Sequence, residues 1–213
     1  KGMASPARFE RAAFGLGNRR LLLYLKLVRV VVIYIYMTIK QLGGDIDGEA
    51  ASNNSGHSVS LSSDGTVVAI GAPENDGNGS NSGHVRVYGW NGSDWTKLGL
   101  DIGGEAAGDW SGYSVSLNND GTILAVGAPY DMNGSVYMFT RSPQDAWLPQ
   151  KIAALPDMKG GRFGSTVVLS GCTVAVSSPQ DVSLTVPTTS ATGTIRTFQY
   201  DENEDSWNVE QIV

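Results

Sequence analysis

The residues with the chemistry to bind a ligand lie in short polar segments of this chain of 213 residues. Asp76, Asn78 and Asn81 stand close together in segment 74–83, and Ca²⁺ is bound by side-chain and backbone oxygens of this kind. The same residue types dominate exposed turns, and we favour a solvated turn over a metal site there. The acidic segment 45–51 allows the same two interpretations, with an exposed loop again favoured. We therefore expect no cofactor, and Asp76, Asn78 and Asn81 are the residues to test for Ca²⁺.

Catalytic side chains do not form a recognisable set in the sequence. The two histidines, His57 and His84, stand where strands are expected to begin, and other repeats hold Tyr, Ser or Thr in their places. Serine is abundant, but the strand-to-helix elbow of a serine nucleophile is absent, and so is a phosphate-binding loop. The sequence therefore predicts a protein that is not an enzyme and has no catalytic residues.

Aromatic residues are the remaining candidates for recognition. Trp95, Trp147 and Trp207 recur at corresponding positions, which favours a role in packing at the edges of repeated units. Trp110 is not repeated, and with Tyr113 it is the best candidate contact for a protein or glycan, although packing is the favoured role for both. The binding candidates are therefore Trp110, Tyr113, Asp76 and Asn78.

Internal repeats must position these residues. Segment 55–73 returns as 111–129, and a divergent third copy covers 163–179. Each of the first two copies has an alternating Ser-Val-Ser-Leu strand, an Asp-Gly turn and an apolar run that ends in Gly-Ala-Pro. The motif residues are Gly56, Asp64, Gly65, Gly71, Ala72, Pro73, Gly112, Asp120, Gly121, Gly127, Ala128, Pro129, Phe163, Gly164 and Pro179.

A third strand and an outer strand follow each motif copy, so each repeat holds about four strands, the content of one propeller blade. We predict an all-β fold with about three consecutive blades of a β-propeller, in the ranges 40–95, 96–147 and 148–213. A closed propeller needs about 4–8 blades. The ring is thus incomplete, and we expect a piece of a longer protein that pairs with remaining blades or with itself. Cys172 is expected on a strand of the third repeat as a small buried residue.

The motif resembles the FG-GAP repeat, the blade unit of integrin-α-type β-propellers. It is most similar to the Trp-, Gly- and Asp-rich version found in large repeat proteins of marine bacteria and algae. The likeness covers roughly residues 40–213, with departures: Ser55 and Ser111 replace the Phe of the motif, and 177–179 read Ser-Ser-Pro instead of Gly-Ala-Pro. The resemblance implies a role in protein binding or cell adhesion.

Integrin-type repeats hold Ca²⁺ in an Asp-x-Asp-x-Asp-Gly loop between the two halves of the motif. Here the interval shrinks to 62–66 and 118–122, with one Asp in each. Ca²⁺ needs about six to eight oxygen ligands, which one Asp in a tight turn does not supply. The metal-binding role of the family is therefore not carried over to these positions.

Charge is divided unevenly along the chain. Residues 1–40 hold eight of the 15 Lys and Arg and one of the 21 Asp and Glu, which leaves seven basic and 20 acidic residues, a net charge of −13, for the rest. A surface of this sign repels phosphate, so nucleic acid is excluded as a partner of the repeats.

The N-terminal segment 1–39 is basic and apolar, and its run 21–39 has two interpretations. Its length suits a signal peptide or signal-anchor that associates with a membrane. Against this, Lys26 and Arg29 each cost about 2.5–3.5 kcal/mol at the bilayer centre. Its Val, Ile and Tyr are typical of strands, and we favour the divergent end of a preceding repeat.

These observations predict a non-enzymatic binding and scaffolding module that presents its variable loops, 74–83 and 107–110, to a protein or glycan. A membrane-tethered accessory subunit of a larger complex is the alternative, and an enzyme built on a propeller is disfavoured. N-glycosylation sequons in expected loops favour an extracellular or cell-surface location. They begin at Asn53, Asn78, Asn91 and Asn133.

Overall fold

A computed structural model describes residues 40–132, 134–153, 161–179, 193–201 and 206–212. The described strands all belong to one compact unit, residues 42–213. The expected N-terminal segment 1–39, with both interpretations of 21–39, lies outside the described residues. Within the described part, no helix has the length and apolar character needed to cross a membrane.

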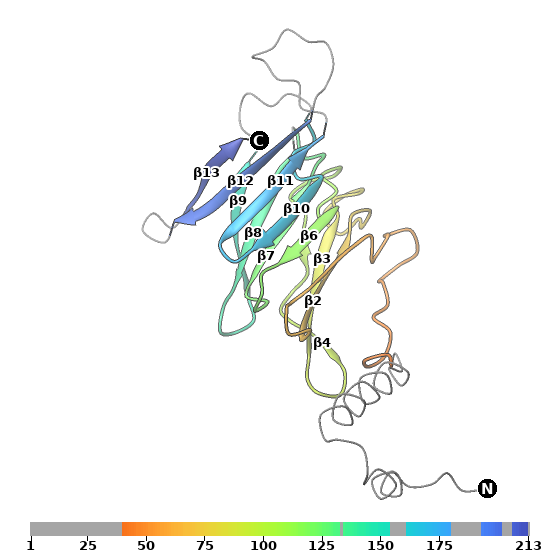
Figure 1. Ribbon diagram of the computed structural model, residues 1–213. Helices are drawn as coiled ribbons and strands as arrows, with labels where there is room; N and C mark the ends of the chain where they lie inside the picture. The colour runs from red at the N-terminus through yellow and green to blue at the C-terminus, as the bar shows by residue number, and fades with distance from the viewer. Residues whose placement is uncertain (1–39, 133, 154–160, 180–192, 202–205, 213) are drawn as a thin grey trace, which may run out of the picture. The chain divides into compact units, whose positions relative to one another are not determined.

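The described secondary structure is entirely β, as the repeats predict, and forms three antiparallel sheets (Figure 1). Each sheet follows the order of the chain, from an inner strand that opens the motif to an outer strand. The first sheet contains β1 (Ser58–Leu61), β2 (Val67–Ala72), β3 (His84–Trp90) and β4 (Trp95–Lys97), with β5 (Ile102–Gly103) also paired to β3. The second contains β6 (Ser114–Leu117), β7 (Ile123–Ala128), β8 (Ser135–Arg141) and β9 (Trp147–Ala153). The third contains β10 (Thr166–Ser170), β11 (Thr173–Ser178), β12 (Thr194–Asp201) and β13 (Ser206–Ile212).

These sheets have the form of consecutive propeller blades, and the described residues do not close a ring. The predicted all-β fold with about three four-stranded blades is confirmed. The outer edge of the first sheet differs from that of the second. Ile102 of β5 pairs with Val85, while Ile152 of the continuous strand β9 pairs with Val136. In the first sheet, therefore, two short strands take the place of one long one.

The Asp-Gly turns form as the sequence predicts. The Asp64 carboxylate accepts hydrogen bonds from the Thr66 N–H at 3.0 Å and from the Ser62 hydroxyl at 2.7 Å. Gly65 then adopts φ +74°, a conformation that glycine reaches without steric cost. These bonds stabilise the charged form of Asp64, and the one from Ser62 does most to lower its pKa. The turn sets the register in which Leu61 lies opposite Val68.

Two hydrophobic cores lie between the sheets and hold them together. One joins the first and second sheets and includes Val85, Val87, Leu117 and Leu124. The other joins the second and third sheets and includes Val136, Met138, Phe163, Val174 and Phe198. Cys172 lies outside both cores. It is exposed in the turn between β10 and β11, so the prediction that it is buried on a strand is wrong.

The serines of the motif connect successive sheets. The Ser58 hydroxyl donates to the Gly112 carbonyl oxygen at 2.8 Å, and Ser114 donates to Gly164 at the same distance. Ser60 and Ser116 instead accept, each at 2.9 Å, from a backbone N–H of the next inner strand. The polar side of the motif strand therefore contacts the next sheet. The alternating pattern alone would assign this side of the strand to solvent.

Candidate binding site

The three copies of the motif open with the same turn. In each copy, a backbone N–H just before the inner strand donates to the carbonyl three residues earlier, and the accepting residue has positive φ. The pairs are His57 with Asn54 at 3.0 Å, Tyr113 with Trp110 at 3.1 Å, and Ser165 with Arg162 at 3.1 Å. Because successive inner strands are joined by the serine hydrogen bonds, this turn is repeated from sheet to sheet at the ends where these strands begin.

Side chains from these turns gather in an aromatic cluster, which consists of His57, Trp110, Tyr113, Tyr130 and Arg162. Tyr130 follows the Gly-Ala-Pro end of the second motif, and its ring centroid lies 5.0 Å from that of Trp110 and 6.3 Å from that of Tyr113. The Arg162 guanidinium lies 4.8 Å from the Tyr130 centroid, the geometry of a cation–π contact. His57 lies 4.8 Å from the Tyr113 ring. The cluster thus spans all three sheets.

Trp110 adopts an unusual backbone conformation within this cluster. Its φ is +56°, the left-handed region that a bulky side chain rarely enters. Such a conformation costs about 1–3 kcal/mol and persists only where the surroundings enforce it. Here the Trp110 N–H donates to the Asn81 carbonyl at 3.1 Å, its own carbonyl closes the turn with Tyr113, and its ring contacts Tyr130. The indole is therefore held, partly exposed, at the protein surface.

The two variable loops named from the sequence lie side by side. Four backbone hydrogen bonds join segment 80–83 to segment 104–111, and Gly83 and Ser111 form a parallel bridge. Two of these bonds run from Gly108 N–H to Ser80 and from Trp110 N–H to Asn81. The loop 74–83 is thus part of the support that fixes Trp110.

The other sequence candidates shape this loop. Asp76 accepts from the Asn81 N–H at 2.8 Å, and the Asn78 amide donates to the Gly104 carbonyl at 2.9 Å. These hydrogen bonds are typical of the polar turn favoured from the sequence. Neither bond joins Asp76 or Asn78 to a residue of the aromatic cluster. Trp110 and Tyr113 are brought together at a ring separation of 6.3 Å, whereas Asp76 and Asn78 serve a neighbouring loop.

A second polar cluster contains Glu49 of the acidic segment 45–51, and its other members were not anticipated from the sequence. Glu49, His84 and Asp101 place potential metal-ligating atoms within 4.8 Å of one another. Arg86 lies among them, with an ion pair to Glu49 and a bidentate pair to Asp101 at 2.9 Å for both contacts. Lys97 adds a second cation 2.5 Å from Asp101. The site is therefore already supplied with positive charge, and we do not assign it to a metal.

The charges of this cluster stabilise one another. The Arg86 guanidinium donates to Asp101 and holds the pKa of that carboxyl well below its usual range, while the same contact raises the pKa of Arg86. Burial lowers the pKa of His84, which favours its neutral form. The sequence signal was the alternation in Val85-Arg86-Val87, which points Arg86 away from the apolar core, but its carboxylate partners depend on how β5 pairs with β3.

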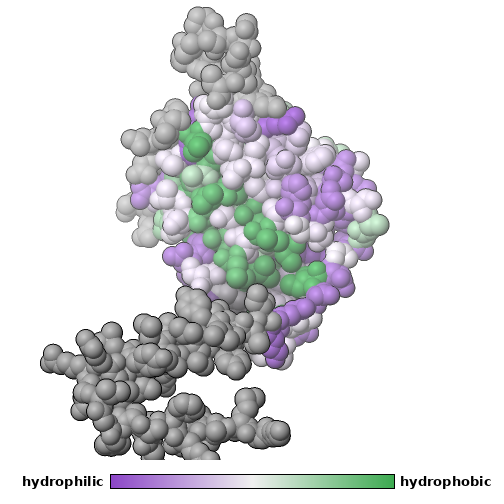
Figure 2. Space-filling view, turned by 45° about the vertical axis from the view of Figure 1, so that its right-hand side comes forward, coloured by the Kyte–Doolittle hydropathy of each residue, from purple (hydrophilic) through white to green (hydrophobic). Residues whose placement is uncertain are grey.

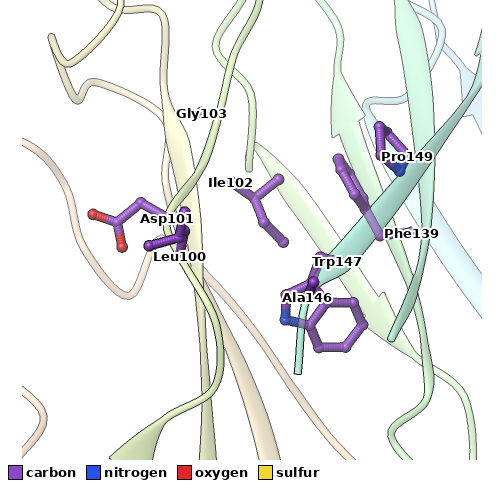
Figure 3. Close-up of a pocket in the computed structure, with 8 residues that line it drawn as sticks. All are labelled: Leu100, Asp101, Ile102, Gly103, Phe139, Ala146, Trp147 and Pro149. Carbon is purple, nitrogen blue, oxygen red and sulfur yellow. The ribbon is translucent and has the colours of Figure 1, made fainter. Parts of the chain in front are cut away.

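A cavity of about 300 Å³ opens at the outer edge between the first and second sheets. Its lining is mainly apolar, and Ile102, Phe139 and Trp147 face one another while Asp101 turns its carboxylate away (Figure 3). The Trp147 indole N–H donates to the Leu98 carbonyl at 3.2 Å, and Trp95 makes the same contact with Leu42 at 3.0 Å. The repeated bond supports the packing role expected for these tryptophans.

Comparisons with known proteins identify the repeats and place the fold. Residues 47–88 and 103–139 match the family model of the FG-GAP repeat. No curated protein matches the chain.

Two solved structures align with this chain at 13% sequence identity. A putative 6-phosphogluconolactonase from Bacteroides uniformis gives a TM-score of 0.52 over 79% of this chain and 43% of its own. Saccharomyces cerevisiae Sqt1 gives 0.48 over 76% of this chain and 36% of its own. This chain therefore spans less than half the length of either structure. The likeness to the putative lactonase, at this identity, concerns the fold alone. The motif and the blade-like sheets agree with the match of these two segments, 47–88 and 103–139, to the FG-GAP repeat.

Proposed function

We propose that this chain is a non-enzymatic binding and scaffolding module that presents the aromatic cluster to a partner. The observation that carries the proposal is the left-handed Trp110, held among Tyr113, Tyr130 and Arg162 at φ +56°. A small or flexible residue would meet the needs of the turn at lower cost, as Asn54 does in the first motif. Strain of this kind is typical of functional positions.

A protein is the partner class that the composition of the cluster favours, with a glycan as the alternative. Trp, Tyr and Arg are the residues that most often dominate the energy of protein interfaces, because they bury a large area with little flexibility. Arg162 adds a cation whose charge is offset by the Tyr130 ring. The net negative charge of the repeats disfavours extended polyanions as partners.

Binding without catalysis is supported by the chemistry of the polar cluster. The carboxylates of Glu49 and Asp101 are paired with Arg86, and Lys97 also contacts Asp101. A general base must take up a proton as it acts, and the hydrogen bonds from Arg86 lower the pKa of Asp101, which makes its carboxylate a weak base. We assign the cluster to stabilisation of the first sheet.

An extracellular or cell-surface location belongs to the same proposal. The sequon at Asn91 lies in the exposed turn between β3 and β4. The side-chain oxygen of Asn91 accepts hydrogen bonds from the backbone N–H groups of Ser93 and Asp94. These bonds do not use the side-chain nitrogen, to which a glycan would attach. Asn78 is less suitable, since its amide nitrogen donates to Gly104.

The proposal is tested by selecting binders and locating where they bind. The chain is screened against a random-peptide display library and, in parallel, a glycan array. Binders are then tested against Trp110→Asn and Tyr113→Ser, which introduce the residues found at these places in the first and third motifs. Loss of binding in both variants supports the proposal, and retention in both contradicts it. The class of probe that gives the sensitive binders decides between protein and glycan.

A further inference from the structure

One face of the first sheet is apolar, and none of the other described residues covers it. Val59 and Leu61 of β1 are 64% and 56% exposed. Their counterparts in the second sheet, Val115 and Leu117, are 8% and 5% exposed, because the first sheet covers them. The side of the molecule that carries the first sheet shows a continuous apolar band bordered by polar residues (Figure 2).

The second strand shows the same difference. Val68 and Ile70 of β2 are only partly buried, whereas Leu124 and Val126 at the same places in β7 are fully buried. Four apolar positions of the first sheet thus face solvent where the repeat elsewhere faces another sheet. Scattered exposed apolar residues are ordinary, but a set that the repeat buries twice elsewhere marks an interface.

The two existing interfaces define what would cover this face. Each preceding sheet presents a hydroxyl that donates to a glycine carbonyl and a second serine that accepts an N–H. Each also presents a glycine in its second strand: a Cβ on Gly71 would lie 2.1 Å from the Gly112 oxygen, and one on Gly127 would lie 2.0 Å from the Gly164 oxygen. The corresponding groups on the first sheet are the Gly56 carbonyl and the Leu61 N–H.

The third sheet cannot supply this pattern from a second copy of the chain. Val168 stands in place of Ser60 and Ser116, so it has no oxygen to accept the Leu61 N–H. Ser177 stands in place of Gly71 and Gly127, so its Cβ would meet the neighbouring carbonyl. The two ends of the array therefore differ: the first sheet retains the receiving half of the interface, and the third keeps only the hydroxyl of the presenting half, on Thr166.

We propose that the face formed by β1 and β2 is a docking surface for another FG-GAP-type sheet. The occupant carries serines at the positions of Ser58 and Ser60 and glycine at the position of Gly71. It covers Val59, Leu61, Val68 and Ile70, and it donates to Gly56 and accepts from Leu61 as the existing sheets do. Head-to-tail association of copies through the third sheet does not occur.

The test supplies such a sheet within the full chain. A second copy of residues 42–97 is inserted between Gln41 and Leu42, so that its Lys97 joins Leu42 as Lys97 joins Leu98 in the native chain. Leu61→Cys in the original first sheet, with Cys172→Ser, reports burial through the rate of thiol labelling. We expect the insertion to slow labelling at least about tenfold, because the thiol becomes buried in a stable interface. Leu117→Cys, in the chain without insertion, gives the rate for a covered position.

The matched control carries Ser60→Val and Gly71→Ser in the inserted copy only, the residues of the third sheet. Labelling in the control is expected to remain as fast as in the chain without insertion. Equal protection by both inserts, or no protection by either, would overturn the proposal. So would an insert that does not fold, since its sequence already forms a sheet in this chain. The chain without insertion gives a further outcome. If its labelling is slow and becomes faster on dilution, two copies of the chain pair at this face, and the proposal is also overturned.

Discussion

The Ser58 hydroxyl donates to the Gly112 carbonyl oxygen at 2.8 Å. The two residues are 54 positions apart in sequence, and their hydrogen bond joins the first and second sheets. The same bond recurs between Ser114 and Gly164. A serine that an alternating pattern assigns to the solvent side of a strand therefore forms the joint between blades. This geometry makes stability depend on small residues at fixed positions.

Removing one of these hydroxyls should destabilise the fold measurably. For Ser58→Ala and Ser114→Ala we expect the free energy of unfolding to fall by about 0.5–1.5 kcal/mol, because each leaves a glycine carbonyl without its donor. Ser114 is buried and Ser58 only partly so, and the effect at Ser114 should be the larger. Thr166→Ala, the corresponding position on the uncovered side of the third sheet, is the control and should change little. Denaturant unfolding measures all three, and an equal loss at Thr166 would contradict the account.

The close approach of the sheets predicts that an added methyl group at Gly127 is poorly tolerated. A Cβ there would lie 2.0 Å from the Gly164 oxygen, and only a shift of the backbone relieves that contact. We expect Gly127→Ala to reduce the free energy of unfolding by about 1–3 kcal/mol or more, the usual cost of overpacking. Gly44→Ala is the matched control, since a Cβ there meets nothing within 4 Å. Similar melting temperatures for the two variants would show that the sheets are not packed as described.

Most of the fold could be predicted because its signals are local. The repeat of the motif, the Asp-Gly turns and the period-two strands each depend on neighbouring residues, and they give the strand content of a blade. Cys172 was misplaced because the third copy replaces Asp-Gly with Gly171-Cys172 in a shorter turn. Without the Asp-Gly pair, this short turn between Ser170 and Thr173 has no clear signal in the sequence and looks like the continuation of a strand.

The candidate site was predictable in part. Trp110 and Tyr113 were named because they break the repeat, but Tyr130 and Arg162 join them only through the packing of sheets. Arg162 occupies the place of Trp110 in the third copy, and comparison of those two positions was the available signal. The pairing of Arg86 with Asp101 depends on the short strand β5, which the sequence did not reveal. Contacts set by pairing between distant strands were the ones missed.

The pairing of Arg86 with Asp101 predicts a dependence of stability on pH. The folded state lowers the pKa of Asp101, chiefly through hydrogen bonds from Arg86, so the folded form binds fewer protons than the unfolded one in mildly acidic solution. The contribution is fully present above the unfolded pKa of about 3.9 and is lost as pH falls below it. Asp101→Asn should lose about 1 kcal/mol at neutral pH, the upper range for partly exposed pairs.

The measurement is urea unfolding of wild type and Asp101→Asn between pH 2 and 7, a range set by the titration of carboxylates. The difference between the two proteins should shrink as the solution becomes acidic. A difference that stays constant over the whole range would mean that Asp101 does not titrate with folding, and that its pairing with Arg86 contributes nothing to pH dependence.

The aromatic cluster predicts that binding and stability respond differently to substitution. Trp110→Asn removes the ring and leaves a residue type that occupies the same left-handed turn at Asn54. Relief of backbone strain should offset part of the lost packing, so we expect the free energy of unfolding to change by less than about 1 kcal/mol. Thermal unfolding checks this. A loss of several kcal/mol would assign Trp110 to the core instead of to recognition.

The most direct test of the account compares one selected binder on four proteins by its Kd. These are wild type, Trp110→Asn, Tyr113→Ser and Leu100→Ser, the last removing an exposed apolar side chain at the outer edge of the first sheet. The account predicts that Kd rises at least about tenfold for Trp110→Asn and Tyr113→Ser, as for a residue that dominates an interface, and is unchanged for Leu100→Ser. A Kd that stays at the wild-type value in both cluster variants would contradict it.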